Sequence, residues 1–236
     1  MSRVIIVKTG STVETIRQTR GDFEQWIAAK AGFSKDEIEV VSVYESEALP
    51  ELSEAVRGII ITGSSAMVSE CEPWSEQSAQ WLKARANTKL PILGICYGHQ
   101  LLAHALGGKV GSNPKGREIG SVQITSTELG RCDPLLTGLG SDFWMQATHR
   151  ESVLELPPKA VCLASNDKDA HQAFRMDDHI WGVQFHPEFD AEIIRAYIEA
   201  RQEVLLQEGL DPSALSTQAK DSESGQKLLQ AFRKML

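Results

Sequence analysis

The chain has 236 residues, of which 42% are hydrophobic and 24% charged, which is enough apolar material for one large or two small globular domains and excludes a disordered chain. Its 24 Lys and Arg residues against 32 Asp and Glu residues give a formal net charge of -8, which disfavours binding to nucleic acid or to an anionic membrane surface. No apolar run approaches the roughly 18 residues of a membrane span, and the apolar stretch after Met1 is too short for a signal peptide. We therefore expect a cytoplasmic protein.

The first half of the sequence alternates short apolar runs with amphipathic stretches. The runs predict strands over residues 4–7, 38–44, 58–62 and 90–96, and the amphipathic stretches predict helices over 22–33 and 73–86. Continuous apolar strands separated by helices are typical of a parallel sheet that is covered on both faces. We expect this half to be an α/β domain.

The pattern changes from Lys109 onward. Short alternating stretches predict antiparallel strands, laid on or beside the parallel core, at residues 121–125, 143–148, 161–165, 172–176 and 180–186. A helix is expected to begin near Asp190, which would be its N-cap. Residues 209–225 are rich in Ser, Asp, Thr and Pro and indicate a surface connection, and a last amphipathic helix follows them. Since no repeat or linker interrupts the chain, we expect a single domain over 1–236, with a core of about 1–208 and a C-terminal extension of 209–236.

Residues 91–108 carry the pattern that points most directly to chemistry. An apolar strand leads into Gly94-Ile-Cys96-Tyr-Gly98, which opens a helix. Glycines two residues to either side permit the sharp turn of a nucleophile elbow, and a helix N-terminus favours the thiolate over the thiol. Cys96 is therefore the candidate nucleophile. The other three cysteines are expected to be ordinary reduced thiols: Cys71, Cys132 and Cys162.

A thiol nucleophile needs a base, and His186 is the best placed of six histidines. It lies near the end of the expected strand in Trp181–Glu188, where residues two apart point the same way, so that Glu188 can orient the His186 ring. A surface salt bridge explains most His-x-Glu pairs when they occur alone, but with the cysteine elbow this pair forms a coherent triad. No spacing of Cys and His fits a metal site, and we expect neither metal nor cofactor.

Acyl transfer also needs N–H donors for the oxyanion. The amide of Tyr97, directly after the nucleophile, is one by the logic of the elbow. The loop Gly63–Ala66, after the strand at 58–62, is either the second donor or a plain strand-to-helix turn.

The motifs Gly94-Ile-Cys-Tyr-Gly-His-Gln100 and His186-Pro-Glu188 together resemble those of the class I glutamine amidotransferases, most of all the glutaminase part of GMP synthase. The resemblance implies an α/β fold with a flavodoxin-like, mostly parallel sheet, flanking helices and a small antiparallel addition. It also implies a triad, a γ-glutamyl thioester on the cysteine, two oxyanion amides, and a set of residues around the substrate. The triad would be Cys96, His186 and Glu188, the oxyanion amides those of Ser64 and Tyr97, and the substrate-binding residues Gly63, Gln100, His149 and Arg150.

Two positions depart from the family pattern. Gly63-Ser-Ser65 stands where Gly-Gly-Pro is usual, and His149-Arg-Glu151 where His-Gly-Asp or a relative is usual. A backbone amide at Ser64 can still donate. Arg150 in place of glycine adds a bulky cation, which would alter how an α-carboxylate or a larger γ-glutamyl substituent is held.

Three functions remain open on the sequence. The first is hydrolysis of glutamine to glutamate and ammonia, with any ammonia acceptor on a separate synthetase polypeptide, since the segment 111–118 fails the P-loop pattern. The second is a γ-glutamyl peptidase that acts on glutathione-like substrates. The third is a catalytically idle, partner-binding subunit, which the complete triad disfavours.

Overall fold

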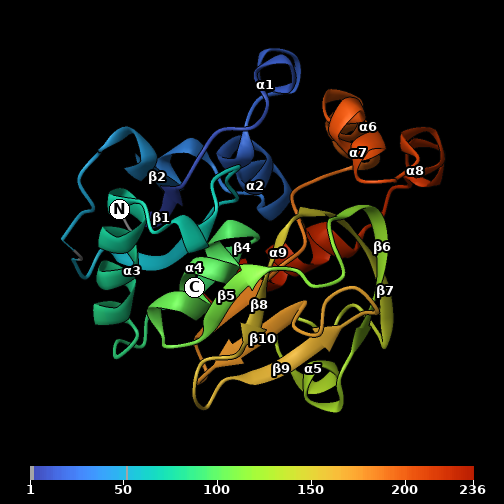
Figure 1. Ribbon diagram of the computed structural model, residues 1–236. Coiled ribbons are helices and arrows are strands. Elements are labelled where there is room, and N and C mark those ends of the chain that lie inside the picture. Colours follow the sequence, from blue (N-terminus) through green and yellow to red (C-terminus); the bar gives the residue numbers. More distant parts are fainter. Residues whose placement is uncertain (1–2, 52) are drawn as a thin grey trace.

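A nine-stranded sheet forms the centre of the computed structural model, which describes residues 3–51 and 53–236 (Figure 1). The strand order is β2-β1-β3-β4-β11-β10-β9-β6-β7. The first five strands of that order pair in parallel, and the remaining pairs are antiparallel. The strands of this sheet are β1 (Arg3–Lys8), β2 (Ile38–Ser42), β3 (Val56–Ile61), β4 (Ile92–Ile95), β6 (Glu118–Ser126), β7 (Asp142–His149), β9 (Val161–Ser165), β10 (Ala173–Met176) and β11 (Ile180–Val183). A separate antiparallel pair consists of β5 (Lys109–Ser112) and β8 (Glu151–Glu155).

Helices cover both faces of the parallel strands. Alternate residues of β1 point to opposite faces, with Val4 and Ile6 in one apolar cluster and Ile5 and Val7 in another. The first cluster also holds side chains of α2 (Phe23–Ala31) and α9 (Ser224–Lys234), and the second holds those of α3 (Pro73–Arg85) and α4 (Tyr97–Ala105). This is the layered α/β arrangement that the sequence predicts, and the fold class is confirmed.

The other helices lie at one end of the sheet or are short. Figure 1 shows α6 (Ala191–Ala200), α7 (Gln202–Gln207) and α8 (Pro212–Gln218) grouped together, well apart from α3. The remainder are α1 (Glu14–Arg20), α5 (Glu128–Cys132) and the 3-10 turns Lys35–Glu37, Val43–Glu45 and Val68–Glu70. Among the described residues, no helix combines the length and the apolar character that crossing a bilayer requires.

Local sequence explains where the best predicted helices begin and end. Asp22 accepts the backbone N–H of Phe23 and forms a capping box with Gln25, and Gly32 ends α2 in the left-handed conformation, at φ 79°. Asp190 caps α6 as predicted, by accepting the Ile193 N–H at 2.7 Å.

Two expectations need correction, and some short elements were not predicted. The expected surface connection 209–225 contains α8, which the proline and serine content hid because Asp211 and Pro212 begin a helix as readily as a turn. The expected antiparallel strand 180–186 is shorter: β11 ends at Val183, and it pairs in parallel with β4 on one side and antiparallel with β10 on the other. The sequence prediction also overlooked α1, a short helix without a long apolar stripe.

Candidate active site

The candidate site lies at the carboxyl ends of the parallel strands, where open α/β sheets usually bind their ligands. The loops after β1 and β3 are tied together there, because the Thr9 hydroxyl donates to the carbonyl of Thr62 at 2.9 Å or to that of Gly63 at 3.1 Å. The loops pack so closely that a Cβ on Gly10 would lie 2.6 Å from Ser64 Oγ. These contacts fix the position of the 63–65 loop beside the end of β4.

Cys96 occupies a sharp turn between β4 and α4. Its backbone has φ 52° and ψ -100°, a conformation that L residues rarely adopt. The flanking glycines are a steric necessity, since a Cβ on Gly94 would lie 2.3 Å from the Gly98 carbonyl oxygen and one on Gly98 would lie 2.5 Å from that of Ile61. This is the geometry of a nucleophile elbow, and among the four cysteines only Cys96 has it.

His186 and Glu188 lie beside the elbow as a hydrogen-bonded pair. The distance from His186 Nδ1 to Glu188 Oε1 is 2.7 Å, and both side chains are buried. Their alignment has a different origin from the predicted one, since β11 ends three residues before His186. An isolated bridge holds His186 instead, through its N–H to the Gln146 carbonyl at 2.7 Å, and the turn that follows brings Glu188 back to the ring.

Aromatic packing sets the plane of the His186 ring. Phe189 stacks on it with ring centroids 4.1 Å apart, and Phe23 lies nearly parallel with its centroid 6.1 Å away. A Cβ on Gly63 would lie 2.9 Å from His186 Cε1, so that glycine is required for the ring to approach the 63–65 loop. The sequence motif ended at Glu188 and missed the contribution of Phe189, the next residue.

The electrostatics of the pair favour a charged thiolate and a charged imidazole. Burial raises the pKa of Cys96, but His186 and, after it, His149 lower that pKa, and together they hold it below its ordinary value. Burial likewise opposes the charge on His186, but Glu188 and Cys96 raise the pKa of His186 to about 10. Among the described residues His186 Nε2 has no hydrogen-bond partner, which leaves its proton available to a reacting group.

Lys30 on α2 supports the loop that carries Glu188. Its ammonium donates to the carbonyls of Phe189 at 2.6 Å and of Pro187 at 3.3 Å. Burial lowers the pKa of Lys30, and the nearby carboxylate of Glu188 partly offsets this. The lysine therefore holds the backbone of this loop on either side of Glu188.

The amides of Ser64 and Tyr97 belong to residues that line an inner pocket of about 250 Å³ around Cys96. The side chains of both residues are hydrogen-bonded to other protein groups. Ser64 Oγ accepts the Ala66 N–H at 3.1 Å, and the Tyr97 hydroxyl donates to Ser75 Oγ at 2.6 Å. Any role in holding an oxyanion therefore falls to their backbone N–H groups, as the sequence predicts.

Gln100 and His149 also line the inner pocket, but protein groups already bind their polar atoms. Gln100 Nε2 donates to the Glu151 carbonyl at 2.8 Å and to Gln184 Oε1 at 3.0 Å. Both ring nitrogens of His149 are engaged, by the Glu151 carbonyl and by Glu118. The nitrogen atoms of these two side chains hold the 149–151 segment in place, which leaves fewer of their groups for a substrate.

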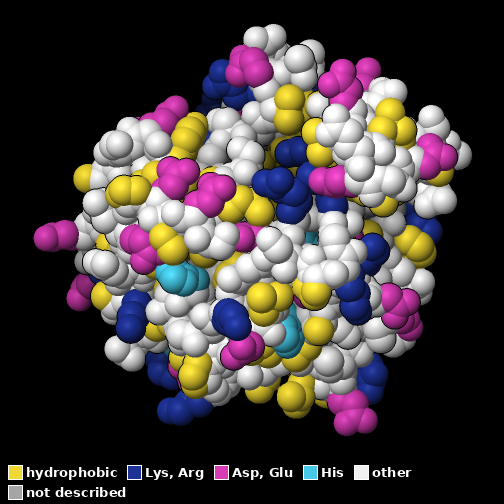
Figure 2. Space-filling model, in the orientation of Figure 1, with side chains coloured by type: hydrophobic (Ala, Val, Ile, Leu, Met, Phe, Trp, Pro, Cys, Tyr) yellow, Lys and Arg dark blue, Asp and Glu magenta, His cyan; other side chains and the backbone are white. Residues whose placement is uncertain are grey.

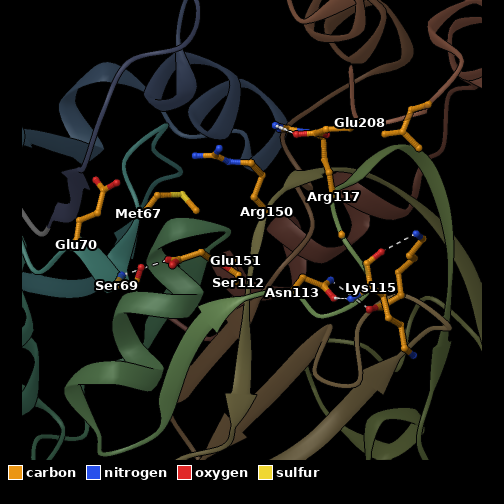
Figure 3. Close-up of a pocket in the computed structure, with 13 residues that line it drawn as sticks. Met67, Ser69, Glu70, Ser112, Asn113, Lys115, Arg117, Arg150, Glu151 and Glu208 are labelled. Carbon is orange, nitrogen blue, oxygen red and sulfur yellow. Dashed lines mark hydrogen bonds and ion pairs between the residues drawn. The ribbon is translucent and has the colours of Figure 1, made fainter. Parts of the chain in front are cut away.

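Arg150 stands where the inner pocket opens into an outer cavity of about 600 Å³ (Figure 3). In Figure 3 its guanidinium extends away from Arg117, which is paired with Glu208 at 2.6 and 3.0 Å. Arg150 itself is exposed and has no ion pair with a described residue. Figure 2 shows Lys and Arg side chains gathered in the hollow between α2 and the α6–α8 group.

Arg201, at the end of α6, is a candidate that the sequence did not indicate. It lines the inner pocket, its guanidinium carbon lies 4.6 Å from the centre of the Tyr197 ring, and its Nη1 is buried without a hydrogen-bond partner among the described residues. Burial lowers the pKa of Arg201, and the charges of Arg117 and Arg150 act in the same direction. A cation in that position would gain from an anionic ligand. No motif surrounds Arg201 that could have revealed it.

The sequence model of the family "Glutamine amidotransferase class-I" matches residues 20–201. The chain belongs to the class I glutamine amidotransferase family. The match spans the elbow and the His186–Glu188 pair, and it confirms the predicted family.

Relatives of two kinds resemble the chain. The GMP synthase [glutamine-hydrolyzing] of Porphyromonas gingivalis strain W83 is 38% identical over 149 residues, which cover 62% of this chain and 28% of that protein. The chain therefore matches little more than a quarter of the length of such GMP synthases. The γ-glutamyl peptidase 3 of Arabidopsis thaliana is 27% identical over 233 residues, 94% of this chain and 92% of that protein. A glutamine amidotransferase structure from Thermotoga maritima, 22% identical, has a TM-score of 0.78 and covers 100% of this chain and 98% of its own, which establishes the shared fold.

Proposed function

We propose that this amidotransferase-family chain hydrolyses a γ-glutamyl amide through a covalent thioester on Cys96. The Cys96 thiolate attacks the γ-carbonyl carbon, a C–S bond forms, and the N–H groups of Ser64 and Tyr97 hold the oxyanion. When the intermediate collapses, the C–N bond breaks and His186 passes its Nε2 proton to the departing amine. Glu188 keeps the imidazole oriented throughout.

Water completes the cycle. His186, now neutral, accepts a proton from a water molecule whose oxygen bonds to the thioester carbon. The C–S bond then breaks, glutamate leaves, and the Cys96 thiolate and His186 imidazolium are restored. The overall products are glutamate and ammonia when the substrate is glutamine, or glutamate and a larger amine when it is not.

One observation supports the proposal above all: Cys96 has the strained backbone of a sharp strand-to-helix turn, and the imidazole that lowers the pKa of its thiol is bound through Nδ1 to Glu188 at 2.7 Å. We expect Cys96→Ala to abolish release of glutamate, and a γ-glutamyl electrophile to label Cys96, as found by mass spectrometry. Serine at each of the other cysteines should leave activity within about twofold. A folded wild-type chain that releases no glutamate from any γ-glutamyl compound would favour the idle-subunit alternative.

A second candidate is a γ-glutamyl peptidase whose leaving group carries a carboxylate, as that of glutathione does. The continuous inner and outer cavities favour it, because together they offer far more room than an ammonia molecule needs. So do Arg150 and Arg201, which line the inner pocket and have no carboxylate partner among the described residues. The peptidase relative, which matches over nearly its full length, is consistent with this candidate.

The choice between the two candidates can be tested at Arg150. If its guanidinium holds a leaving-group carboxylate, Arg150→Gln should lower kcat/KM for glutathione roughly 10- to 150-fold and leave kcat/KM for glutamine unchanged. This factor corresponds to a loss of ~1.5–3 kcal/mol of transition-state binding. Arg131→Gln, which changes an exposed arginine on α5, is the matched control. An equal loss for both substrates would reject selection by Arg150 and favour the glutaminase, with its ammonia passed to a separate synthetase.

A further inference from the structure

His149 ends β7 and lies in the wall of the inner pocket, with 5% of its surface exposed. Its direct partner across the strands is Glu118 on β6, which is equally buried. Two titratable side chains therefore face one another next to Cys96, and the mechanism above uses neither of them.

The hydrogen bonds of the His149 ring determine where its protons are. Nδ1 lies 2.8 Å from the Glu151 carbonyl oxygen, and Nε2 lies 2.9 Å from Glu118 Oε2. Because a carbonyl oxygen can only accept, Nδ1 carries a hydrogen. The state of Nε2 then depends on whether Glu118 is ionised.

Glu118 is surrounded by donors, as an ionised carboxylate would require. Asn166 Nδ2 donates to Oε1 at 2.7 Å, and Gln172 Nε2 donates to Oε2 at 2.6 Å. The Asn166 amide cannot be turned around, since its Oδ1 already accepts two backbone N–H groups at 3.0 and 2.8 Å. Burial raises the pKa of Glu118, but the bonds from His149 and the two amides outweigh it and leave the pKa below its ordinary value. Nε2 of His149 must therefore donate as well.

We propose that His149 is a permanent imidazolium, clamped between Glu118 and the Glu151 carbonyl, whose charge favours the thiolate of Cys96. It is a positioning residue, because both of its N–H bonds point to fixed protein acceptors and cannot deliver a proton to a leaving group. His186, with Nε2 free, moves the proton, and His149 keeps its charge through every step. The inference rests on the proposed role of Cys96 as nucleophile.

The titratable groups around the His149 ring support a fixed positive charge on it. Glu118 faces it from β6, Asp169 from the loop before β10, Cys96 from the start of α4, and His99 from within α4. The acidic groups favour a charge on His149 and outweigh its burial, so that its pKa is raised. Burial lowers the pKa of His99 to about 4, which leaves that ring neutral at pH 7.

The first test reads the protonation of the ring directly, by ¹⁵N spectroscopy of histidine-labelled full-length chain. His179, which also faces a carboxylate and a carbonyl, and His186 are both changed to Gln to remove their signals. At pH 8 an ordinary imidazole, with a pKa of about 6.5, is neutral. We expect one ring with both nitrogens protonated, and its loss when Glu118→Gln is added. A folded chain without such a ring at pH 8 would overturn the proposal.

The second test measures the effect on Cys96, as the rate of its labelling by iodoacetamide against pH, site by site in the mass spectrum. In a folded Glu118→Gln chain the labelling at pH 7 should be about three- to tenfold slower, with an unchanged rate at high pH, because less thiolate is present at neutral pH. The matched control is Glu76→Gln, which removes the carboxylate 2.9 Å from His104, outside the pocket. An unchanged Cys96 profile in Glu118→Gln would refute the proposed influence.

The labelling also separates this inference from the proposed function. A chain that labels at Cys96 with the expected dependence on Glu118, yet releases no glutamate, would retain the charge clamp and lose the hydrolase. A chain that releases glutamate, but whose Cys96 labelling profile is the same with and without the Glu118 carboxylate, would retain the hydrolase and refute the charge clamp.

Discussion

Glu188 governs the pH range over which His186 can act as an acid. The carboxylate contributes to raising the pKa of His186 to about 10, so the imidazolium that protonates the leaving amine in the proposed mechanism persists well above neutral pH. Glu188→Gln removes this contribution, and we expect the alkaline limb of the kcat/KM profile to move to lower pH while the protein stays folded. Glu223→Gln, at an exposed acid of α9's N-cap, should leave the limb in place.

The roles of His186 and Glu188 can also be compared by how much kcat/KM each variant loses. His186→Ala removes the group that transfers the proton and should reduce kcat/KM by about 10²–10⁴-fold, while Glu188→Gln, whose amide oxygen can still accept from Nδ1, should cost less. Steady-state release of glutamate measures both. If His186→Ala were harmless, the general base would have been assigned to the wrong histidine.

Single site residues could be predicted from the sequence where a short local motif marks them. Cys96, with its glycines, and the His186-x-Glu188 spacing lie within short segments, and the structure places them together. Arg201 reaches the pocket from the end of α6, and Glu118 on β6 contacts His149 in the pocket wall. Both come from distant parts of the chain, and no local pattern marks them. The placement of Arg150 was likewise open, because a side chain of that length can face either solvent or a cavity.

At the scale of elements, α9 is the support of the His186–Glu188 loop. A Cβ on Gly225, in its first turn, would lie 2.1 Å from the Pro187 carbonyl, and Phe232 packs edge-to-face on Trp181 of β11. We expect Phe232→Ala to lower the free energy of unfolding by ~3–5 kcal/mol, measured in urea. Leu206→Ala, at a residue that is 57% exposed on α7, should change it by less than about 0.5 kcal/mol. Similar losses in the two variants would contradict this role of α9.

Elements were predictable where their pattern was complete. Strands with continuous apolar runs, such as β1 and β3, and helices with caps, such as α2, appear where expected. The parallel pairing of β11 with β4 was hidden, because strand direction depends on which neighbour the chain meets after some 80 residues, and periodicity along a strand does not encode this. The division into a core of about 1–208 and an extension over 209–236 stays a prediction; within the extension, Leu228, Leu229 and Phe232 belong to the same apolar cluster as Val4 and Ile6 of β1.

Across the whole molecule, one apolar cluster runs through both the parallel and the antiparallel strands. It contains Ile6 of β1, Leu93 of β4 and Phe143 of β7, so the two halves share this part of the core. We therefore expect far-UV circular dichroism and tryptophan fluorescence to report the same single transition in urea, and Phe143→Ala to shift both midpoints together. Two separated transitions would mean that the chain unfolds as two domains.

The backbone of Cys96 implies that this protein carries a conformational cost at its proposed nucleophile. A left-handed φ of 52° with ψ -100° disfavours any side chain, typically by about 1–3 kcal/mol, and only glycine escapes most of that strain. Among inactive variants, Cys96→Gly should therefore unfold at a higher urea concentration than Cys96→Ala, although glycine also loosens the unfolded chain. If Cys96 is the nucleophile, as proposed, stability and chemistry make opposite demands on this one residue.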